Sequence, residues 1–98
     1  MPFLALLKRE LYGKTNLDEI SETERESLIS TTADIIEMLR RETQQQVDFW
    51  ENYSAQKRVR AYILNQLLSA FRGNKEFVKN RNQVVEKILE LANYTRWN

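Results

Sequence analysis

The side chains with the clearest chemical potential are three cations, Lys57, Arg58 and Arg60, which follow a group of aromatic residues. Cations interleaved with aromatic rings suit single-stranded nucleic acid, because phosphates pair with the charges and bases stack on the rings. The same cations could bind an acidic protein surface or pair with carboxylates of their own chain. Cysteine and histidine are absent, which excludes disulfides, thiol chemistry, zinc fingers and histidine-based acid-base catalysis.

The neighbouring aromatic residues, Phe49, Trp50, Tyr53 and Tyr62, cluster around a predicted break between two helices. Aromatic residues at such spacing usually form the core of a helix junction, and Trp50 continues the apolar stripe of the preceding helix. The competing interpretation is an exposed stacking platform for nucleic acid. The exposure of Trp50 distinguishes the two.

Catalytic motifs are weak. Gly13-Lys14-Thr15 imitates the end of a phosphate-binding loop, but Lys8 occupies the place of the first glycine and no predicted strand precedes it. The chain also lacks the spaced carboxylates and strand lysine of a metal-dependent nuclease. We therefore expect no catalytic, metal-binding or cofactor-binding residue, and we predict that this chain is not an enzyme by itself.

Charge is distributed unevenly along the chain. Residues 1–53 contain 6 Lys and Arg against 11 Asp and Glu, a net charge of −5, and residues 54–98 contain 9 against 3, a net charge of +6. Either the acidic and basic helices neutralise each other on packing, or the basic half offers a face to phosphates or to an acidic protein.

Arg60 and Arg81 fall inside the apolar stripes of predicted helices. An unpaired buried guanidinium would be very costly, so each needs an acid or must extend to water. The internal candidates are Glu37, Asp48 and Glu51, and the alternative is an outward-facing site for a partner chain.

The cations also lie in the first two turns of the predicted helix, where the helix dipole disfavours positive charge by a few tenths to about 1 kcal/mol each. Either Asp48 and Glu51 neutralise them, or they await an anionic partner. For a partner, one face of the helix offers a continuous polar strip of Arg58, Asn65, Ser69 and Arg72.

The first two predicted helices begin at Pro2 and after Ser21. Gly13 can end the first in the left-handed conformation, and its side chains are apolar almost all round, which favours the end of a larger helical region over a helix held between neighbours. Residues 14–20 are predicted to form a loop. The second helix starts with a capping box between Ser21 and Glu24. Its apolar stripe comprises Leu28, Thr32, Ile35, Ile36, Leu39, Thr43, Gln46, Val47 and Trp50.

An unbroken second helix from residue 22 to residue 50 would be about 44 Å long. A compact domain of this size is only about 33 Å across. We therefore expect its second half to protrude, bend or rest against a partner, with the change at residues 43–46.

The third predicted helix covers residues 55–72 with Ser54 as its cap, and the fourth covers residues 75–93 after a turn at Gly73 and Asn74. The fold prediction is an all-α domain, a small bundle of about four helices with a single core. Its predicted inward residues are Val59, Ile63, Leu67, Ala70 and Phe71 in the third helix, and Phe77, Val84, Val85, Ile88, Leu89 and Ala92 in the fourth.

Residues 47–64 also carry a family resemblance. The residues concerned are Phe49, Trp50, Asn52, Ala55, Gln56, Val59, Arg60 and Ile63. They resemble the pattern F-W-x-N-x-x-A-Q-x-x-L-R-x-x-I in the closing helical domain of the motor (restriction) subunit of type I restriction-modification enzymes. The resemblance covers about residues 17–97. It implies that residues 1–13 are the end of a preceding linker helix and that residues 14–98 are a C-terminal assembly domain.

In such motors a nuclease domain and two helicase-type lobes, which use ATP and Mg, precede this helical domain. The resemblance implies that the domain docks the motor onto the methyltransferase core of specificity and modification subunits, in the cytoplasm. No membrane role is expected, because the longest apolar run, residues 3–7, is far too short to cross a bilayer. The basic half supplies the predicted contact residues Lys57, Arg58, Arg72, Lys75 and Lys79.

Two alternatives remain open. The basic half could track a nucleic-acid backbone, with an affinity that falls steeply with salt. The chain could instead be a structural adaptor that oligomerises.

Overall fold

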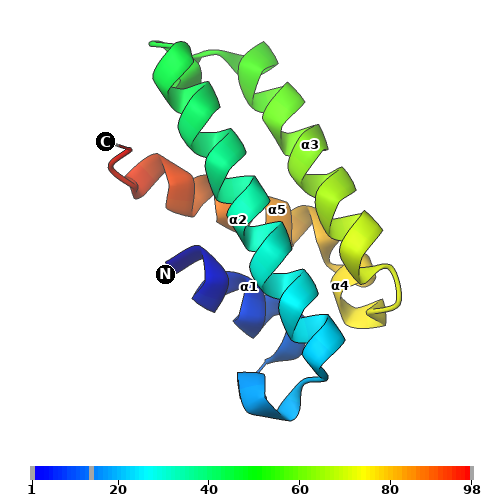
Figure 1. Cartoon of the computed structure of the whole chain (residues 1–98). Coiled ribbons are helices and arrows are strands. Elements are labelled where there is room, and N and C mark those ends of the chain that lie inside the picture. The colour runs from blue at the N-terminus through cyan, green and yellow to red at the C-terminus, as the bar shows by residue number, and fades with distance from the viewer. Residues whose placement is uncertain (1, 14, 98) are drawn as a thin grey trace.

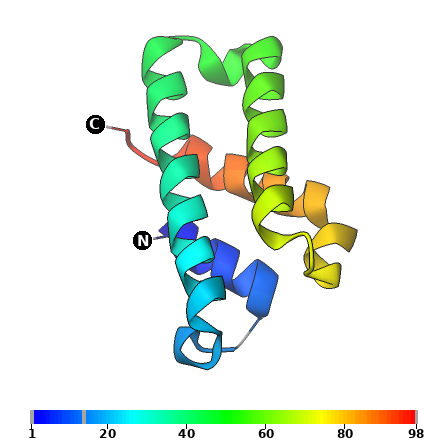
Figure 2. The same cartoon turned by 45° about the vertical axis from the view of Figure 1, so that its right-hand side comes forward.

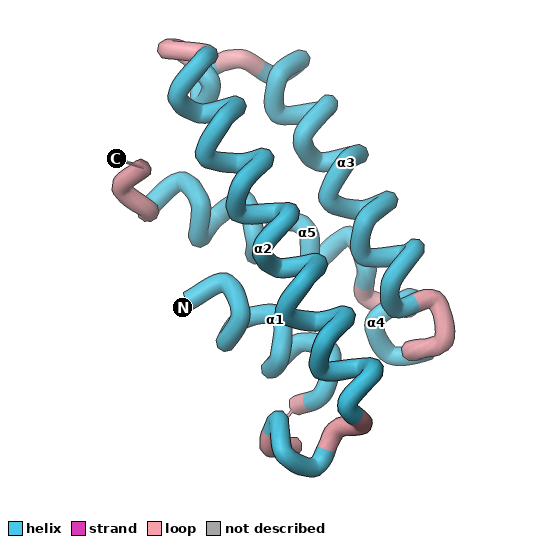
Figure 3. The backbone as a smooth tube through the Cα atoms, in the orientation of Figure 1, coloured by secondary structure: helices cyan, strands magenta, loops and turns pink. Residues whose placement is uncertain are grey.

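The computed structural model describes residues 2–13 and 15–97, and these residues form helices and short connections without a strand (Figure 3). The all-α prediction is therefore confirmed. Two 3-10 turns, Leu17–Glu19 and Phe49–Glu51, lie in the connections. Within the described residues the five α-helices are α1 (Pro2–Tyr12), α2 (Glu22–Gln45), α3 (Tyr53–Phe71), α4 (Lys75–Lys79) and α5 (Arg81–Tyr94).

The helices form two crossed pairs. α2 and α3 lie side by side as an antiparallel hairpin, and α1 and α5 cross this hairpin as a second pair (Figures 1 and 2). α1 and α5 run in opposite directions, because Phe3 packs on Trp97 with ring centroids 5.8 Å apart while Glu10 pairs with Lys87 toward the other end. The closed end of the hairpin extends beyond this pair, which contributes to dimensions of 41 × 27 × 19 Å.

One hydrophobic core joins all five helices. α1 buries Phe3, Leu6, Leu7 and Leu11 in it and contacts both α2 and α5. This helix is therefore part of the bundle, and the origin of residues 1–13 in a longer preceding helix stays a prediction; Met1 itself lies outside the described residues. The side chains that are completely inaccessible to solvent include Leu7, Leu28, Leu39, Ile63, Leu67, Phe77 and Ile88.

Several helix ends form where their capping residues predict. The amide of Gly13, whose φ is 61°, donates to the Arg9 carbonyl at 2.9 Å and ends α1. Ser21 Oγ accepts from the Glu24 amide at 3.2 Å and begins α2. α2 ends at Gln45, inside the stretch where a change of course was predicted.

Two boundary predictions are wrong. Asn52 rather than Ser54 caps α3, because the Asn52 side-chain oxygen accepts from the Ala55 amide at 3.0 Å. The single helix predicted over residues 75–93 is broken at Asn80. The side chain of Asn80 donates to the Glu76 carbonyl at 3.2 Å, and such local bonds compete with the helical ladder.

The predicted stripes need corrections in the second and third helices. Val47 is fully exposed, because α2 ends before it. Ala70 is exposed as well, because it borders an open hollow between α1, α2 and the end of α3. Thr31 and Met38, which the stripe omitted, are buried. The other predicted inward residues of the third and fourth helices are buried.

The C-terminal residues close over the bundle. Trp97 Nε1 donates to the Ala92 carbonyl at 3.1 Å, and the Trp97 carbonyl accepts from Gln44 Nε2 at 3.2 Å. Together with the ring contact to Phe3, these bonds hold the segment after α5 against α1 and α2.

Candidate functional site

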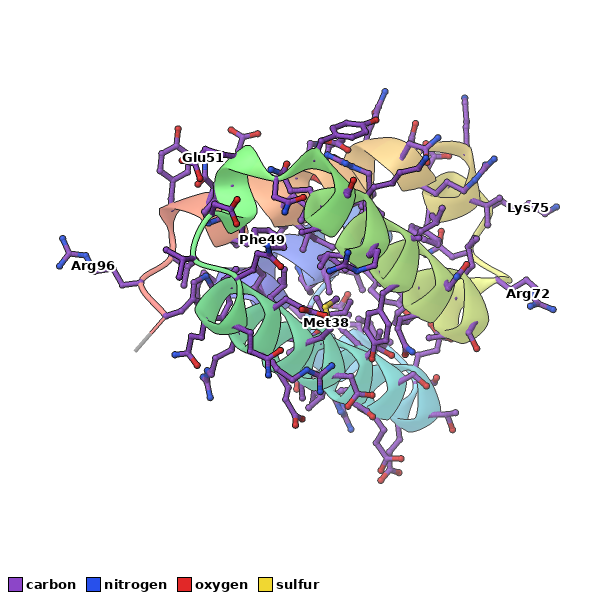
Figure 4. The ribbon with its side chains drawn as sticks, turned by 90° about the horizontal axis from the view of Figure 1, so that it is seen from above. Met38, Phe49, Glu51, Arg72, Lys75 and Arg96 are labelled. Carbon is purple, nitrogen blue, oxygen red and sulfur yellow. The ribbon has the colours of Figure 1, made fainter. Side chains whose placement is uncertain are left out.

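The structure divides the five predicted contact residues into two groups. Lys57 and Arg58 lie near the start of α3, whereas Arg72, Lys75 and Lys79 surround the corner between α3 and α4. We call these the Lys57–Arg58 pair and the corner cluster. Lys57 and Arg72 are separated by about 22 Å along the helix axis, from 1.5 Å per residue. All five side chains are exposed, and Figure 4 shows Arg72 and Lys75 extending from the same end of the molecule.

A polar strip links the two groups. Asn65 and Ser69 are exposed and lie between Arg58 and Arg72 on the outward face of α3, so the predicted strip is present. Exposed residues on this part of α3 carry no charge. The α3 strip therefore has positive ends and a neutral, hydrogen-bonding middle.

Arg60 is engaged within the chain. Its Nε and Nη2 atoms donate to Glu86 Oε1 and Oε2 of α5, at 2.5 and 3.3 Å. The predicted internal pair thus exists, but Glu37, Asp48 and Glu51 were the wrong candidates, because this edge of α3 faces α5. Arg60 is consequently not one of the free cations.

Arg81, the other arginine in an apolar stripe, reaches the surface. It is exposed, and its Nη1 atom donates to the Val78 carbonyl at 2.7 Å. The break at Asn80 makes this possible, because Arg81 begins a new helix instead of lying inside a continuous one.

The helix dipole opposes these cations less than expected. α3 begins at Tyr53, so Lys57 is its fifth residue, and the dipole effect falls off within the first turn. Among the described residues, Asp48 and Glu51 form no ion pair with Lys57 or Arg58. Neutralisation across the α2–α3 connection is therefore not seen.

The aromatic residues do not form one platform. Phe49 is only 1% exposed and meets the half-buried Trp50 edge-on, with ring centroids 4.7 Å apart. Trp50 packs against the core, which favours the core interpretation for both. Tyr53 and Tyr62 are exposed, but they lie more than two helical turns apart on α3.

A polar junction that joins α1, α2 and the α3–α4 turn was not predicted from the sequence. A hollow of about 370 Å³ there is lined by Tyr12, Glu24, Ala70, Phe71, Gly73 and Asn74. Burial, together with a hydrogen bond to Glu24 and its negative charge, raises the pKa of Tyr12 to about 12. Asn74 donates to the Leu11 carbonyl at 2.9 Å and accepts from the Phe77 amide at 3.0 Å.

The described residues offer few features of a metal site, a phosphate-binding loop or a membrane span. No group of three or more His, Cys, Asp or Glu side chains there is placed to hold a metal ion. Lys14 of the loop-like motif lies outside the described residues, and no strand precedes Gly13 in the described part of the chain. None of the described helices combines the length and apolarity needed to cross a membrane.

Comparisons with protein-family models, curated proteins and solved structures gave no match. The resemblance to type I restriction motors therefore stays a prediction.

Proposed function

We propose that this helical domain is a non-catalytic assembly module that binds a partner protein through the outward face of α3 and the corner cluster. One observation carries the proposal. Exposed cations gather on this side of the molecule without an ion pair among the described residues, whereas nearby Arg60 is held by Glu86. The contact residues are Lys57, Arg58, Arg72, Lys75 and Lys79.

The distribution of charge favours a protein over duplex DNA. A duplex presents one negative charge per roughly 1.7 Å of its axis, so a face that follows it gains most from closely spaced cations. The α3 strip instead leaves a neutral polar stretch between Arg58 and Arg72. Two acidic patches separated by hydrogen-bonding groups would complement it.

The resemblance of residues 47–64 supplies the candidate partner. We take it to be the methyltransferase core of a type I restriction enzyme, in the cytoplasm, with this chain as the closing domain of the motor subunit. ATP hydrolysis, Mg binding and DNA cleavage would then be properties of the parent motor.

A capture assay between the 98-residue chain and the methyltransferase core tests the proposal. Charge reversal of the Lys57–Arg58 pair, and separately of the corner cluster, should each lower affinity by about tenfold or more, equivalent to about 1.4 kcal/mol. Reversal of Arg40 and Arg41, which are exposed on α2, is the matched control and should change affinity less than about twofold. Full binding by both test variants would refute the assigned surface.

The same variants distinguish the nucleic-acid alternative. Binding to duplex DNA that falls with salt, with a slope of about −0.9 per neutralised phosphate, and that requires the corner cluster would assign these cations to DNA. Absence of DNA binding at low salt, together with capture of the core, would assign them to protein.

A further inference from the structure

The α1–α5 pair has an outer face, on the side away from α2, that contains an open groove of about 560 Å³. Each helix contributes residues at positions i, i+3, i+4 and i+7, which form one stripe along that helix. We call this surface the α1–α5 face. Its lining residues are Pro2, Ala5, Leu6 and Arg9 from α1, and Lys87, Glu90, Leu91 and Tyr94 from α5.

Charges of both signs border this groove. Arg9 on α1 and Glu90 on α5 are exposed, and neither forms an ion pair within the described part of the chain. Lys87 is already held by Glu10, with 2.8 Å between Nζ and Oε1. The groove thus offers one free cation from one helix and one free anion from the other.

The two stripes also differ in size. α1 presents the small residues Pro2 and Ala5, whereas α5 presents Leu91 and Tyr94, and Tyr94 is 79% exposed. Because the helices are antiparallel, Pro2 and Tyr94 lie toward the same end of the groove and Arg9 lies toward the other, near Lys87. Large residues on one stripe and small ones on the other are complementary to each other.

A second copy of this chain satisfies both features. A two-fold axis parallel to the helices places α1 of one copy over α5 of the other without reversing the direction of the groove. Arg9 then lies over the turn of α5 in the second copy that carries Lys87 and Glu90. Because Lys87 is already paired with Glu10, Glu90 is the free anion within reach of Arg9. Pro2 and Ala5 receive Tyr94 and Leu91 of the second copy. The two-fold axis repeats every contact.

We infer that this chain associates with itself through the α1–α5 face. α1 is only about 16 Å long, so the contact is smaller than the roughly 800 Å² per partner of a standard interface. Association is correspondingly weak.

Sedimentation equilibrium of the full chain, from about 10 µM to about 1 mM, tests the inference. The average mass should rise toward that of a dimer. Arg9→Glu and Glu90→Arg should each weaken association about tenfold, and the double variant R9E/E90R should restore it to within about threefold, because the swap recreates the opposite charges. A monomer over the whole range, or a double variant no better than the single ones, would overturn the inference.

Two further variants locate the contact. Ala5→Arg fills the groove without removing a buried group and should abolish association, whereas Lys57→Glu, near the start of α3, should leave it unchanged. Association that survives Ala5→Arg would also overturn the inference. Self-association does not depend on the proposed docking function, so either can fail while the other stands.

Discussion

The outer face of α3 and the α1–α5 face rest on the same core but differ in charge and shape. The α3 strip has cations at its ends and uncharged polar side chains between them. The α1–α5 face has an apolar groove bordered by one free cation and one free anion. A face of one sign repels its own copy, whereas a face with both signs can pair with itself. Net charge alone therefore does not reveal which surface selects a foreign partner and which can bind an identical chain.

The largest expected effect comes from the core beneath both faces. Ile63 is completely buried, and Ile63→Ala should lower the free energy of unfolding by about 2–5 kcal/mol, because it removes packing and leaves a cavity. Urea unfolding followed by circular dichroism measures this. Capture of the methyltransferase core and self-association should be lost together. A variant that keeps its stability, or that loses only one of the two activities, would contradict a single hydrophobic core beneath both faces.

A smaller effect tests the start of α3, which carries the strip. Asn52→Ala removes the cap bonded to the Ala55 amide and should cost about 1 kcal/mol of unfolding free energy. Ser54→Ala, the matched control, should change the free energy by less than about 0.5 kcal/mol, because Ser54 is exposed and lies inside the helix. A larger loss of unfolding free energy for Ser54→Ala than for Asn52→Ala would indicate that Ser54 is the cap.

The ion pair between Arg60 and Glu86 joins the helix of one face to a helix of the other. A double-mutant cycle with alanine at both positions should give a coupling energy of about 0.2–1 kcal/mol that shrinks in high salt, since both side chains are partly exposed. The pair of Glu10 and Lys87, which lies beside the groove, provides the comparison. Zero coupling would show that Arg60 is free to join the cations of the α3 strip.

The last effect concerns the junction at Tyr12 and is confined to alkaline pH. Its pKa is raised from 10.0 to about 12 in the folded chain, so the unfolded chain loses this proton first as pH rises. The stabilisation is complete below pH 10 and is lost as pH rises toward 12. In pH-dependent unfolding, Tyr12→Phe should make this decline shallower. Glu24→Gln removes the neighbouring charge and should have a partial effect of the same sign; identical curves for all three proteins would exclude a role for this tyrosine.

Local signals were sufficient to predict most of the fold. The apolar stripes, the Ser21 cap and Gly13 locate α1 and the start of α2, because each acts within one or two turns of the chain. The choice between Asn52 and Ser54 was harder, since both residues cap helices well. It depends on the 3-10 turn at Phe49–Glu51, which tertiary packing of Phe49 holds in place. The break at Asn80 was missed because an asparagine inside a helical pattern can also point to solvent and leave the helix intact.

The surfaces, too, could be predicted only where local signals define them. The α3 strip could be predicted because one helix carries all its residues. The partner of Arg60 could not, because it depends on which edge of α3 faces α5. The groove was even harder to predict, because Pro2 and Tyr94 come from opposite ends of the chain. They line the same groove only through the antiparallel packing of α1 and α5.

The contact of Trp97 with Phe3 brings the beginning and the end of the described chain together. A circular permutant that joins these ends through a short glycine linker and opens the exposed turn at Gly73 should therefore retain the bundle. In that rearranged gene product the corner cluster would be split between the new first and last residues, while the α1–α5 face would become a continuous helical hairpin.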